Sequence, residues 1–383
     1  MSVRILHTSD VHLGATFKML GARGREQHKQ LQQTFANVVS LAIQERVDVV
    51  LIAGDLFDSV AAARTEAGFA GAQFERLGAA DIPICAIAGN HDPLDEGSAG
   101  LWRDLEARHP HLRVFGPDLE VRTLRERDVT IVGRSAAHRV SARSPLTGPS
   151  ARAGGVPAPR TTKYLVGVFH GSVQRPDFES KFGLITPEEI AASGLDYLAL
   201  GDWHSALDVS SGGVTAWYSG APEMIDVDEG ASGNVLLVTL RAPGRAEVER
   251  RRVGRRRAAR LDLDLVTAGG AAGVERAIRE RADTDLALQV TLSGLVAVGE
   301  RFDVARLRED LRSEFFRLEI RDASQVRADD ADLTEYPEGT MLGRFVRRMR
   351  DEIAARQGEE RTVAEDALAY GVALLQGRTG VLG

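Results

Sequence analysis

The chain of 383 residues contains one cysteine, Cys85, and no long hydrophobic stretch. A single cysteine excludes an intramolecular disulfide and any metal cluster built on several thiolates. No segment approaches the roughly 18 consecutive apolar residues that a membrane-spanning helix needs. The sequence therefore predicts a protein without a membrane segment, in which metal ligands would have to be His, Asp, Glu or Asn side chains.

An export signal is also missing from the first residues, which enter an apolar strand pattern at residue 3. We therefore expect a cytoplasmic protein. The net charge of -7 argues mildly against attraction of the whole surface to nucleic acid, yet nine arginines and only two glutamates fall between residues 241 and 260. Within this arginine-rich segment, the run from Glu249 to Arg260 has two interpretations, a solvated junction between domains or a contact to a phosphate backbone.

Short β-branched runs alternate with helical patterns over the first 240 residues, which is typical of α/β domains. Residues 141–160, rich in proline and glycine, are expected to form a long surface loop. The sequence Thr186-Pro187-Glu188-Glu189 has the order of a capping box and predicts that a helix begins there. Strands are expected at residues 3–7, 47–53, 82–88, 129–132, 164–169, 197–200, 215–218 and 234–240.

Beyond the arginine-rich segment, strand and helix patterns alternate in the order of a small βαβαβ unit. Its strands are expected at 261–266, 286–292 and 318–321, and its helices at 274–281 and 304–315. One apolar stripe, which predicts a helix, follows at Leu342, Phe345, Val346, Met349 and Ile353. A second helix is expected to begin at Thr362, because Glu365 completes a capping box. The predicted domains are residues 1–245, 258–330 and 333–383.

Acidic, amide and imidazole residues cluster directly after the carboxyl ends of five expected strands, where the sites of α/β proteins form. Each cluster alone has a plain explanation as a cap or a paired polar group, but five at one sheet edge predict a metal site. Oxygen and imidazole ligands suit Mn²⁺, Fe²⁺ or Zn²⁺, and their number suits two ions better than one. The clusters are Asp10-Val11-His12, Gly54-Asp55-Leu56-Phe57-Asp58, Gly89-Asn90-His91-Asp92, His170-Gly171 and Gly201-Asp202-Trp203-His204.

These five clusters, in this order, resemble the motifs of the binuclear metallophosphoesterase superfamily. Within it, residues 5–14, 53–58 and 197–201 are similar to the SbcD-type DNA repair exonucleases, nuclease subunits that pair with a coiled-coil ABC-type ATPase. The resemblance is strong over residues 1–240. It implies an α/β fold with two packed mixed β-sheets flanked by helices (αββα), a small α+β capping domain that shapes a DNA groove, and a helical C-terminal tail.

The resemblance also implies site residues. Its motifs would place Asp10, His12, Asp55 and His204 on one metal ion, and Asp55, Asn90, His170 and Asp202 on a second, with Mn²⁺ expected and Fe²⁺ or Zn²⁺ as alternatives. The family pattern has a histidine where Asp202 stands, so we expect an altered metal preference. His91 would face the scissile phosphate and assist departure of the leaving oxygen, and Asp58 would hold its imidazole.

The function implied is Mn²⁺-dependent exonuclease and endonuclease cleavage of DNA in double-strand-break repair, by a homodimer acting with an SbcC-like ATPase. One alternative is a phosphodiesterase or phosphatase for small molecules or phosphoproteins, because the same metal centre serves all of these. Another is a DNA-end-binding scaffold in which Asp202 weakens catalysis. His7 is interpreted as a hydrogen-bonded core residue, and Trp203 either stacks on a base or supports the core. The C-terminal stripe either packs on its own domain or contacts the ATPase.

Overall fold

A computed structural model of the chain describes residues 2–140, 143–147, 161–175, 182–226, 232–296, 303–326, 336–337 and 339–375. The chain divides into two compact units, Met1–Ala258 and Ala259–Gly383. Most of the expected loop at residues 141–160 lies outside the described residues, and only residues 143–147 of it are described.

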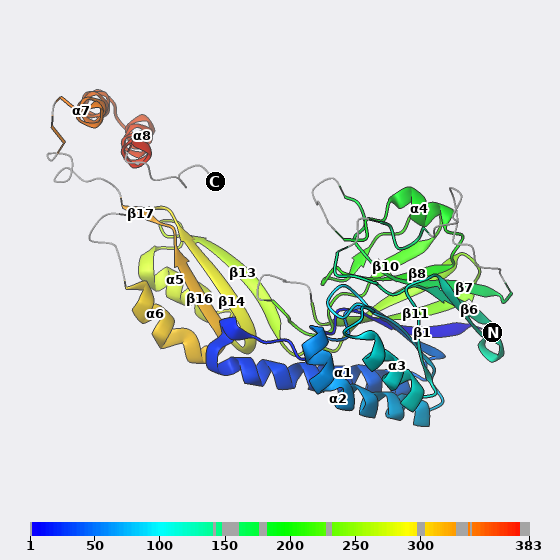
Figure 1. The fold of residues 1–383 in the computed structure, drawn as a ribbon. Helices are drawn as coiled ribbons and strands as arrows, with labels where there is room; N and C mark the ends of the chain where they lie inside the picture. The colour runs from blue at the N-terminus through cyan, green and yellow to red at the C-terminus, as the bar shows by residue number, and fades with distance from the viewer. Residues whose placement is uncertain are drawn as a thin grey trace. The chain divides into compact units, whose positions relative to one another are not determined.

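Two six-stranded mixed sheets form the first unit (Figure 1). The first sheet has the order β12-β11-β1-β2-β3-β4, in which β1 to β4 are parallel and β11 and β12 are antiparallel to their neighbours. The second has the order β5-β6-β7-β8-β10-β9, with antiparallel strands only at its two edges.

The strands of the first sheet are β1 (Val3–Thr8), β2 (Val49–Ala53), β3 (Ile84–Ile87), β4 (Leu112–Val114), β11 (Asn234–Ala242) and β12 (Arg245–Arg252). Those of the second are β5 (Glu120–Leu124), β6 (Val129–Gly133), β7 (Tyr164–His170), β8 (Tyr197–Gly201), β9 (Leu207–Asp208) and β10 (Thr215–Tyr218). All eight strands expected from the sequence are present. The shorter or more polar strands β4, β5, β9 and β12 were not predicted.

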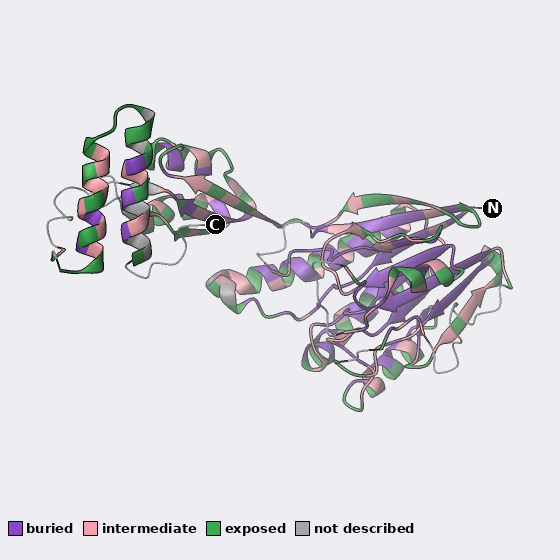
Figure 2. Ribbon diagram, turned by 90° about the horizontal axis from the view of Figure 1, so that it is seen from above, coloured by how far each residue is buried: buried purple, intermediate pink, exposed green. Residues whose placement is uncertain are grey.

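The core of the first unit lies in layers on both sides of each sheet. Ile5 packs between the two sheets and Leu6 packs toward the helices, because successive strand side chains point to opposite faces. Burial on both faces also explains why the central strands are continuous apolar runs rather than alternating patterns. In Figure 2 these strands are drawn largely in purple, the colour of buried residues.

Three helices cover the outer face of the first sheet, α1 (Gly24–Gln44), α2 (Val60–Ala79) and α3 (Ala99–Arg108), and α4 (Pro187–Ala192) lies on the outer face of the second (Figure 1). Two 3₁₀ helices, Lys18–Arg23 and Arg125–Arg127, complete the unit. The predicted αββα architecture is confirmed. The capping box at Thr186 is also present, with both reciprocal hydrogen bonds to Glu189 formed.

The arginine-rich segment contains the edge strand β12, and the boundary between the two compact units, after Ala258, also lies within it. Ala246 and Val248 pack against the core between the sheets, and the Arg250 guanidinium lies 5.0 Å from the centre of the Trp217 ring. Ala246 and Val248 thus face the protein, while Arg245, Glu247 and Glu249, which alternate with them, are exposed. The charge of the exposed face obscures this period-2 pattern in the sequence.

The second unit contains a three-stranded sheet in the order β13-β14-β16, in which β14 and β16 are parallel. Its elements alternate as predicted: β13 (Arg257–Asp264), α5 (Gly270–Arg279), β14 (Asp283–Ser293), α6 (Val304–Leu311) and β16 (Phe315–Asp322). The helix predicted at 304–315 is too long, because the chain leaves α6 through a 3₁₀ turn, Arg312–Glu314, and Phe315 is buried as the first residue of β16. Two short strands, β15 (Leu295–Val296) and β17 (Gln325–Val326), pair in parallel.

Two helices near the C-terminus, α7 (Met341–Ala354) and α8 (Glu359–Leu375), pack on one another. Buried Val346 of α7 meets Leu368 and Val372 of α8, which confirms that the predicted stripe is an internal contact face. The predicted helix start at Thr362 is wrong, because α8 begins directly after Gly358, whose positive φ of 59° lets the chain turn there. None of the described helices is long and apolar enough to cross a lipid bilayer.

Candidate metal centre

The residues predicted as ligands converge where five parallel strands end. Asp10 and His12 follow β1, Asp55 follows β2 and Asn90 follows β3, all in the first sheet. In the second sheet, His170 is the last residue of β7, and Asp202 and His204 follow β8. Within each of three groups, one potential ligand atom per residue lies within 4.8 Å of the others. The groups are Asp10, His12 and His204; Asp10, Asp55 and His170; and His12, Asp58 and His91.

Asp55 and His170 form the buried centre of this arrangement, with 2% of each residue exposed. His170 Nε2 lies 3.3 Å from Asp55 Oδ2 and 2.8 Å from Asn90 Oδ1. Its Nδ1 donates a hydrogen bond to the Ala53 carbonyl oxygen at 2.9 Å. Burial acts to raise the pKa of Asp55, but the neighbouring His170 and His12 imidazoles outweigh it and lower that pKa. Burial acts to lower the pKa of His170, but the neighbouring negative charge of Asp55 outweighs it. The pKa of His170 is therefore well above its ordinary value.

His12 connects two of the groups. Its Nδ1 lies 3.3 Å from Asp58 Oδ1, and because a carboxylate accepts hydrogen bonds, Nδ1 is the nitrogen that carries the proton. Its Nε2 is buried 3.8 Å from Asp55 Oδ2 and has no hydrogen-bond partner among the described residues. The His12 ring meets the His204 ring edge-on, with 5.2 Å between the ring centres.

Asp202, the residue that departs from the family pattern, faces the same centre. Its backbone N–H donates to Asp10 Oδ1 at 3.0 Å, and its own Oδ1 lies 4.0 Å from His170 Nε2. The Ser172 hydroxyl donates to its other carboxylate oxygen. Burial, followed by the charges of Asp10 and Asp55, raises the pKa of Asp202 despite the opposing effect of His170 and Ser172. A carboxylate in this position therefore belongs to the cluster.

Several of these residues have backbone conformations that are unusual for a side chain. Asp10, His12 and Asp55 have φ values of 52°, 50° and 51°, in the left-handed region, and Asp202 has a φ of 105°. Such conformations cost on the order of 1 kcal/mol each or more, and they persist where the surroundings fix them. Here backbone hydrogen bonds join the first two loops, Asp10 N to Gly54 O at 3.1 Å and His12 N to Asp55 O at 3.0 Å.

Asp58 contacts both His12 and His91, but through different atoms. Its carboxylate is directed at His12, whereas His91 Nδ1 donates to its backbone carbonyl oxygen at 3.1 Å. The backbone N–H of His91 donates to Asp55 Oδ1 at 2.8 Å. The sequence predicted that the Asp58 carboxylate holds the His91 imidazole. In the structure that carboxylate contacts His12, and main-chain atoms of Asp58 and His91 orient His91 instead. Such main-chain contacts cannot be recognised from the sequence.

Two supporting residues had no predicted role. Asp92, which is fully buried, accepts hydrogen bonds from the N–H groups of Gly89 at 2.7 Å and Phe57 at 3.0 Å, and so joins the loops after β2 and β3. Burial, together with the Asp55 charge, raises the pKa of Asp92 to about 7. Ser172 positions Asp202. The place of Asp92 directly after Asn90 and His91 could have indicated its role, whereas the contact of Ser172 depends on the fold.

The remaining expectations concern His7 and Trp203. His7 is fully buried in β1, with Nδ1 2.8 Å from the Tyr197 hydroxyl and Nε2 3.2 Å from the Leu200 carbonyl oxygen, which confirms a hydrogen-bonded core residue. Trp203 packs against the outer core of the second sheet, and the Arg175 guanidinium lies 4.2 Å from the centre of its ring. This packing supports the structural interpretation, and stacking on a base stays a prediction.

The donor set fits a divalent metal centre. The carboxylates of Asp10, Asp55 and Asp202 lie beside the imidazoles of His12, His170 and His204 in a largely buried space, where uncompensated negative charge is costly. His12 Nε2 is a buried acceptor without a partner among the described residues, and its Nδ1 is held by a carboxylate, the arrangement that orients metal-binding histidines. Oxygen and nitrogen ligands without thiolate suit Mn²⁺, Fe²⁺ or Zn²⁺.

Similarity to known proteins agrees with this site. "Uncharacterized metallophosphoesterase YhaO" of Bacillus subtilis is 28% identical over 61% of this chain and 56% of its own length. "DNA double-strand break repair protein Mre11" of Methanosarcina acetivorans is 29% identical over 66% of this chain and 39% of its own length. The Mre11 protein of Halobacterium salinarum is 24% identical over 96% of this chain and 90% of its own. The chain thus spans less than two thirds of the first two of these relatives.

Among solved structures, the calcineurin-like phosphoesterase YfkN from Bacillus subtilis has a TM-score of 0.42 and 11% identity, over 66% of this chain and 91% of that one. Residues 3–141, which carry the clusters after β1, β2 and β3, match the sequence pattern described as calcineurin-like phosphoesterase. Calcineurin-like phosphoesterases bind a dinuclear metal centre, and the first unit of this chain has the metallophosphoesterase fold.

Proposed function

We propose that this chain is a Mn²⁺-dependent DNA nuclease, with exonuclease and endonuclease activity, that hydrolyses phosphodiester bonds in double-strand-break repair. The convergence of ligand atoms from five strand ends carries the phosphoesterase part of the proposal. The similarity to Mre11 proteins, which extends over 96% of the chain in one case, supports DNA as the substrate. The basic edge strand β12 is consistent with a polyanionic substrate.

Asp10, His12, Asp55 and His204 would hold one ion, and Asp55, Asn90, His170 and Asp202 the second. Bound divalent cations supply Lewis-acid polarisation of a phosphodiester and activation of a water nucleophile. The protein's part is to fix the donors in place. Asp58 orients His12, Ser172 orients Asp202, and Asp92 holds the loops that carry Asp55 and Asn90.

His91 is the proposed general acid. Because its Nδ1–H is held by the Asp58 carbonyl oxygen, Nε2 is the atom left to exchange a proton with a leaving sugar oxygen. The ring is only partly buried and lies edge-on to His12, with 4.6 Å between ring centres, so it borders the ligand cluster without belonging to its buried core.

A Mn²⁺ titration with two substrates tests the proposal. Short double-stranded DNA and a generic aryl phosphodiester are each incubated with the full-length chain at increasing Mn²⁺. The proposal predicts cleavage of both, saturating with Mn²⁺ and abolished by a chelator. Cleavage of the aryl ester alone would favour the alternative of a small-molecule phosphodiesterase or phosphatase, and DNA binding without any hydrolysis would favour a DNA-end-binding scaffold.

We also propose that the chain acts as a homodimer with an SbcC-like ATPase, which the helical pair α7–α8 would contact. The pair encloses its own apolar seam, yet Met341 and Val363 remain 74% and 63% exposed. Exposed apolar residues on helices are typical of surfaces that bind partner helices.

A further inference from the structure

The loop of residues 219–224, which directly follows β10 and is called the β10 loop, contacts the candidate metal centre. Its first residue, Ser219, is fully buried, and Ser219 Oγ lies 2.8 Å from Ser9 Oγ. The Ser9 hydroxyl in turn donates a hydrogen bond to Asp10 Oδ2 at 2.5 Å. The carboxylate of Asp10 is therefore connected to the β10 loop by two buried hydroxyl groups.

The β10 loop also holds the main chain of a second expected ligand, His204. The Ala221 N–H donates to the His204 carbonyl oxygen at 2.9 Å. A Cβ added to Gly220 would lie 2.7 Å from the same oxygen, so the two stretches of chain are in close contact. Potential ligand atoms of Asp10 and His204 belong to one group with His12. The β10 loop thus supports two of the ligands expected on one ion, called the first ion.

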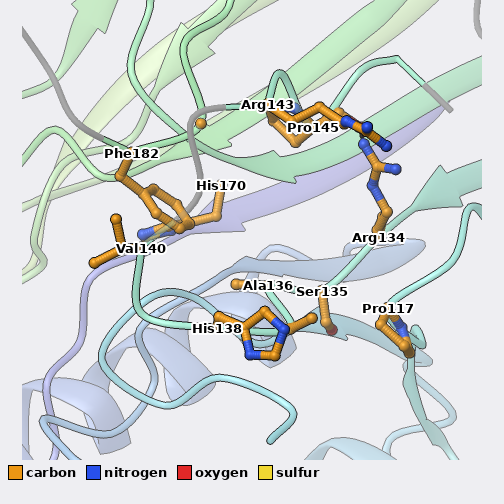
Figure 3. Close-up of a pocket in the computed structure, with 12 residues that line it drawn as sticks. Pro117, Arg134, Ser135, Ala136, His138, Val140, Arg143, Pro145, His170 and Phe182 are labelled. Atoms are coloured by element: carbon orange, nitrogen blue, oxygen red, sulfur yellow. Dashed lines mark hydrogen bonds between the residues drawn. The ribbon is translucent and has the colours of Figure 1, made fainter. Parts of the chain in front are cut away.

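The ligands expected only on the second ion have other supports. Within the described residues, no hydrogen bond joins the β10 loop to Asn90, His170 or Asp202. His170 instead borders a cavity of about 160 Å³ with Pro145 and Phe182 in its wall (Figure 3), and the described lining residues include none from the β10 loop. A change in the β10 loop should therefore affect the first ion and leave the second largely unchanged.

Glu223, near the other end of the β10 loop, is a fully buried carboxyl group. Its Oε2 accepts hydrogen bonds from the Thr34 hydroxyl of α1 at 2.7 Å and from the Arg255 N–H at 2.9 Å. Its Oε1 accepts from the Arg256 N–H at 2.9 Å. These bonds offset the cost of burying the group. They also fasten the loop to residues 253–256, called the exit segment, which precede the boundary of the first unit.

We propose that Glu223 is a positioning residue, which ties the ligands of the first ion to the exit segment from which the second unit begins. The inference rests on the proposed metal-dependent function. A second connection runs in parallel: the Gly233 N–H donates to the Ala221 carbonyl oxygen at 2.8 Å, and the Gly233 carbonyl oxygen accepts from the Gly254 N–H at 3.0 Å. Displacement of the exit segment therefore shifts Ala221, and with it His204, and weakens binding of the first ion.

Glu223→Gln in the full-length chain tests this role. Each carboxylate oxygen accepts one N–H of the exit segment, so a glutamine of the same size must place its NH₂ group against one of these two donors. Thr34→Val is the matched control, because it removes another hydrogen bond of Glu223 and leaves both bonds to the exit segment. Glu223→Gln should weaken binding of one of two Mn²⁺ ions about tenfold, as groups that support metal ligands do, and Thr34→Val should weaken neither.

Two further measurements separate positioning from stability. In the metal-free chain, hydrogen exchange of the Ala221 N–H should be faster in Glu223→Gln than in the wild type. In a His204→Ala background, Glu223→Gln should cause little further loss of Mn²⁺ affinity, because effects that act through one residue are not additive. If Glu223→Gln does not fold, Gly254→Ala replaces it. A Cβ at Gly254 would lie 2.6 Å from the Pro222 carbonyl oxygen and push the exit segment from the loop, with the same selective loss expected.

Wild-type Mn²⁺ affinities in Glu223→Gln, or equal losses in Glu223→Gln and Thr34→Val, would overturn the positioning role and make Glu223 a structural residue. Full additivity with His204→Ala would do the same. A wild-type chain that binds no Mn²⁺ would instead overturn the proposed metal centre and function. In that case the hydrogen exchange of Ala221 would decide separately whether Glu223 holds the β10 loop.

Discussion

At the scale of single residues, the candidate centre combines strained backbone with buried charge. Asp10, His12 and Asp55 each occupy the left-handed region, which places their side chains toward one point at the end of the sheets. Such conformations lower the stability of the fold and are concentrated at functional sites, where they place reactive groups. Single substitutions in this group should therefore separate metal binding, proton transfer and folding.

His91→Ala should lower the rate of DNA cleavage by at least about 100-fold, because it removes the proposed general acid. Affinities for Mn²⁺ and DNA should change little, since the ligand cluster keeps its side chains. Cleavage rate, Mn²⁺ binding and DNA binding are measured for the variant and for His111→Ala, which removes a histidine that lies against Gly78 of α2 and belongs to none of the three ligand groups. Cleavage by His91→Ala at the wild-type rate would contradict this role.

His7 makes the stability of the first unit depend on pH. Burial lowers the pKa of His7 to about 3, although its bond to the Leu200 carbonyl acts in the opposite direction. Between about pH 6.5 and 3, the unfolded chain then binds a proton at this residue that the folded chain does not. The free energy of unfolding should fall as the pH falls, by about 1.4 kcal/mol per pH unit from this residue.

His7→Asn should reduce that dependence by the same amount. Denaturant unfolding between pH 6.5 and 4 measures the slope, and His138→Asn, which removes an exposed imidazole, serves as the control. An unchanged slope in His7→Asn would show that His7 is not a neutral buried group.

The identities of the site residues could be read from the sequence, but their contacts could not. Asp10, Asp55 and His170 were predictable because each directly follows or ends an apolar strand. The partner of Asp58 was not, because the atom that holds His91 is a main-chain carbonyl. Nor was Ser172, which reaches Asp202 only because the ends of β7 and β8 are adjacent.

At the scale of elements, parallel strands bring the site together. β1, β2 and β3 are neighbours in one sheet and β7 and β8 in the other, so their carboxyl ends deliver five loops to one place. Glycines allow these loops to approach. Gly54 has a φ of 91°, and a Cβ added to it would lie 2.3 Å from His170 Nδ1. A Cβ at Gly89 would lie 2.2 Å from Asp55 Oδ1.

Gly54→Ala should therefore destabilise the first unit by at least about 2 kcal/mol and displace His170. The positive φ of Gly54 disfavours any residue with a Cβ, and the added Cβ would clash with the His170 ring. Gly213→Ala is the matched control, because its φ of 88° is similar but an added Cβ meets nothing within 4 Å. Gly213→Ala should lower the free energy of unfolding by only about 1 kcal/mol, because only the backbone conformation opposes it. Equal effects on unfolding and on Mn²⁺ affinity would contradict a specific role for close approach at Gly54.

Element boundaries were predictable where the pattern was strong. The strand at Thr215–Tyr218 has the expected bounds. β12 was missed because its apolar face contains only Ala246 and Val248 between charged residues, and its identity as a strand comes from pairing with β11. The start of α8 was misplaced because Gly358, and not a polar cap, determines it.

At the scale of the whole molecule, the chain joins a metallophosphoesterase unit to a smaller unit with its own core. This smaller core includes Val274 and Ile278 of α5 and Leu311 of α6, so the βαβαβ part has a hydrophobic core of its own. The helices α7 and α8 have a third, small cluster of their own.

Deletion of residues 333–383 should leave cleavage of short DNA substrates intact and abolish association with an SbcC-like ATPase. Cleavage and co-purification with the ATPase measure the two effects, and light scattering of the full-length chain tests for the proposed homodimer. Substitution of exposed Met341 and Val363 by serine gives a milder variant that keeps the seam between the helices. If the deleted chain fails to fold, or if the double variant still binds the ATPase, the tail is structural.

The central claim is that the buried cluster is a dinuclear metal centre with Asp55 shared between the ions. Equilibrium binding of Mn²⁺ to the full-length chain tests it most directly, with Asp55→Asn beside Asp104→Asn, which removes an exposed carboxylate of α3. We predict two ions per chain for the wild type and for Asp104→Asn, and loss of tight binding at both positions in Asp55→Asn. A wild-type chain that binds no Mn²⁺, or an Asp55→Asn variant that binds it as the wild type does, would contradict the account.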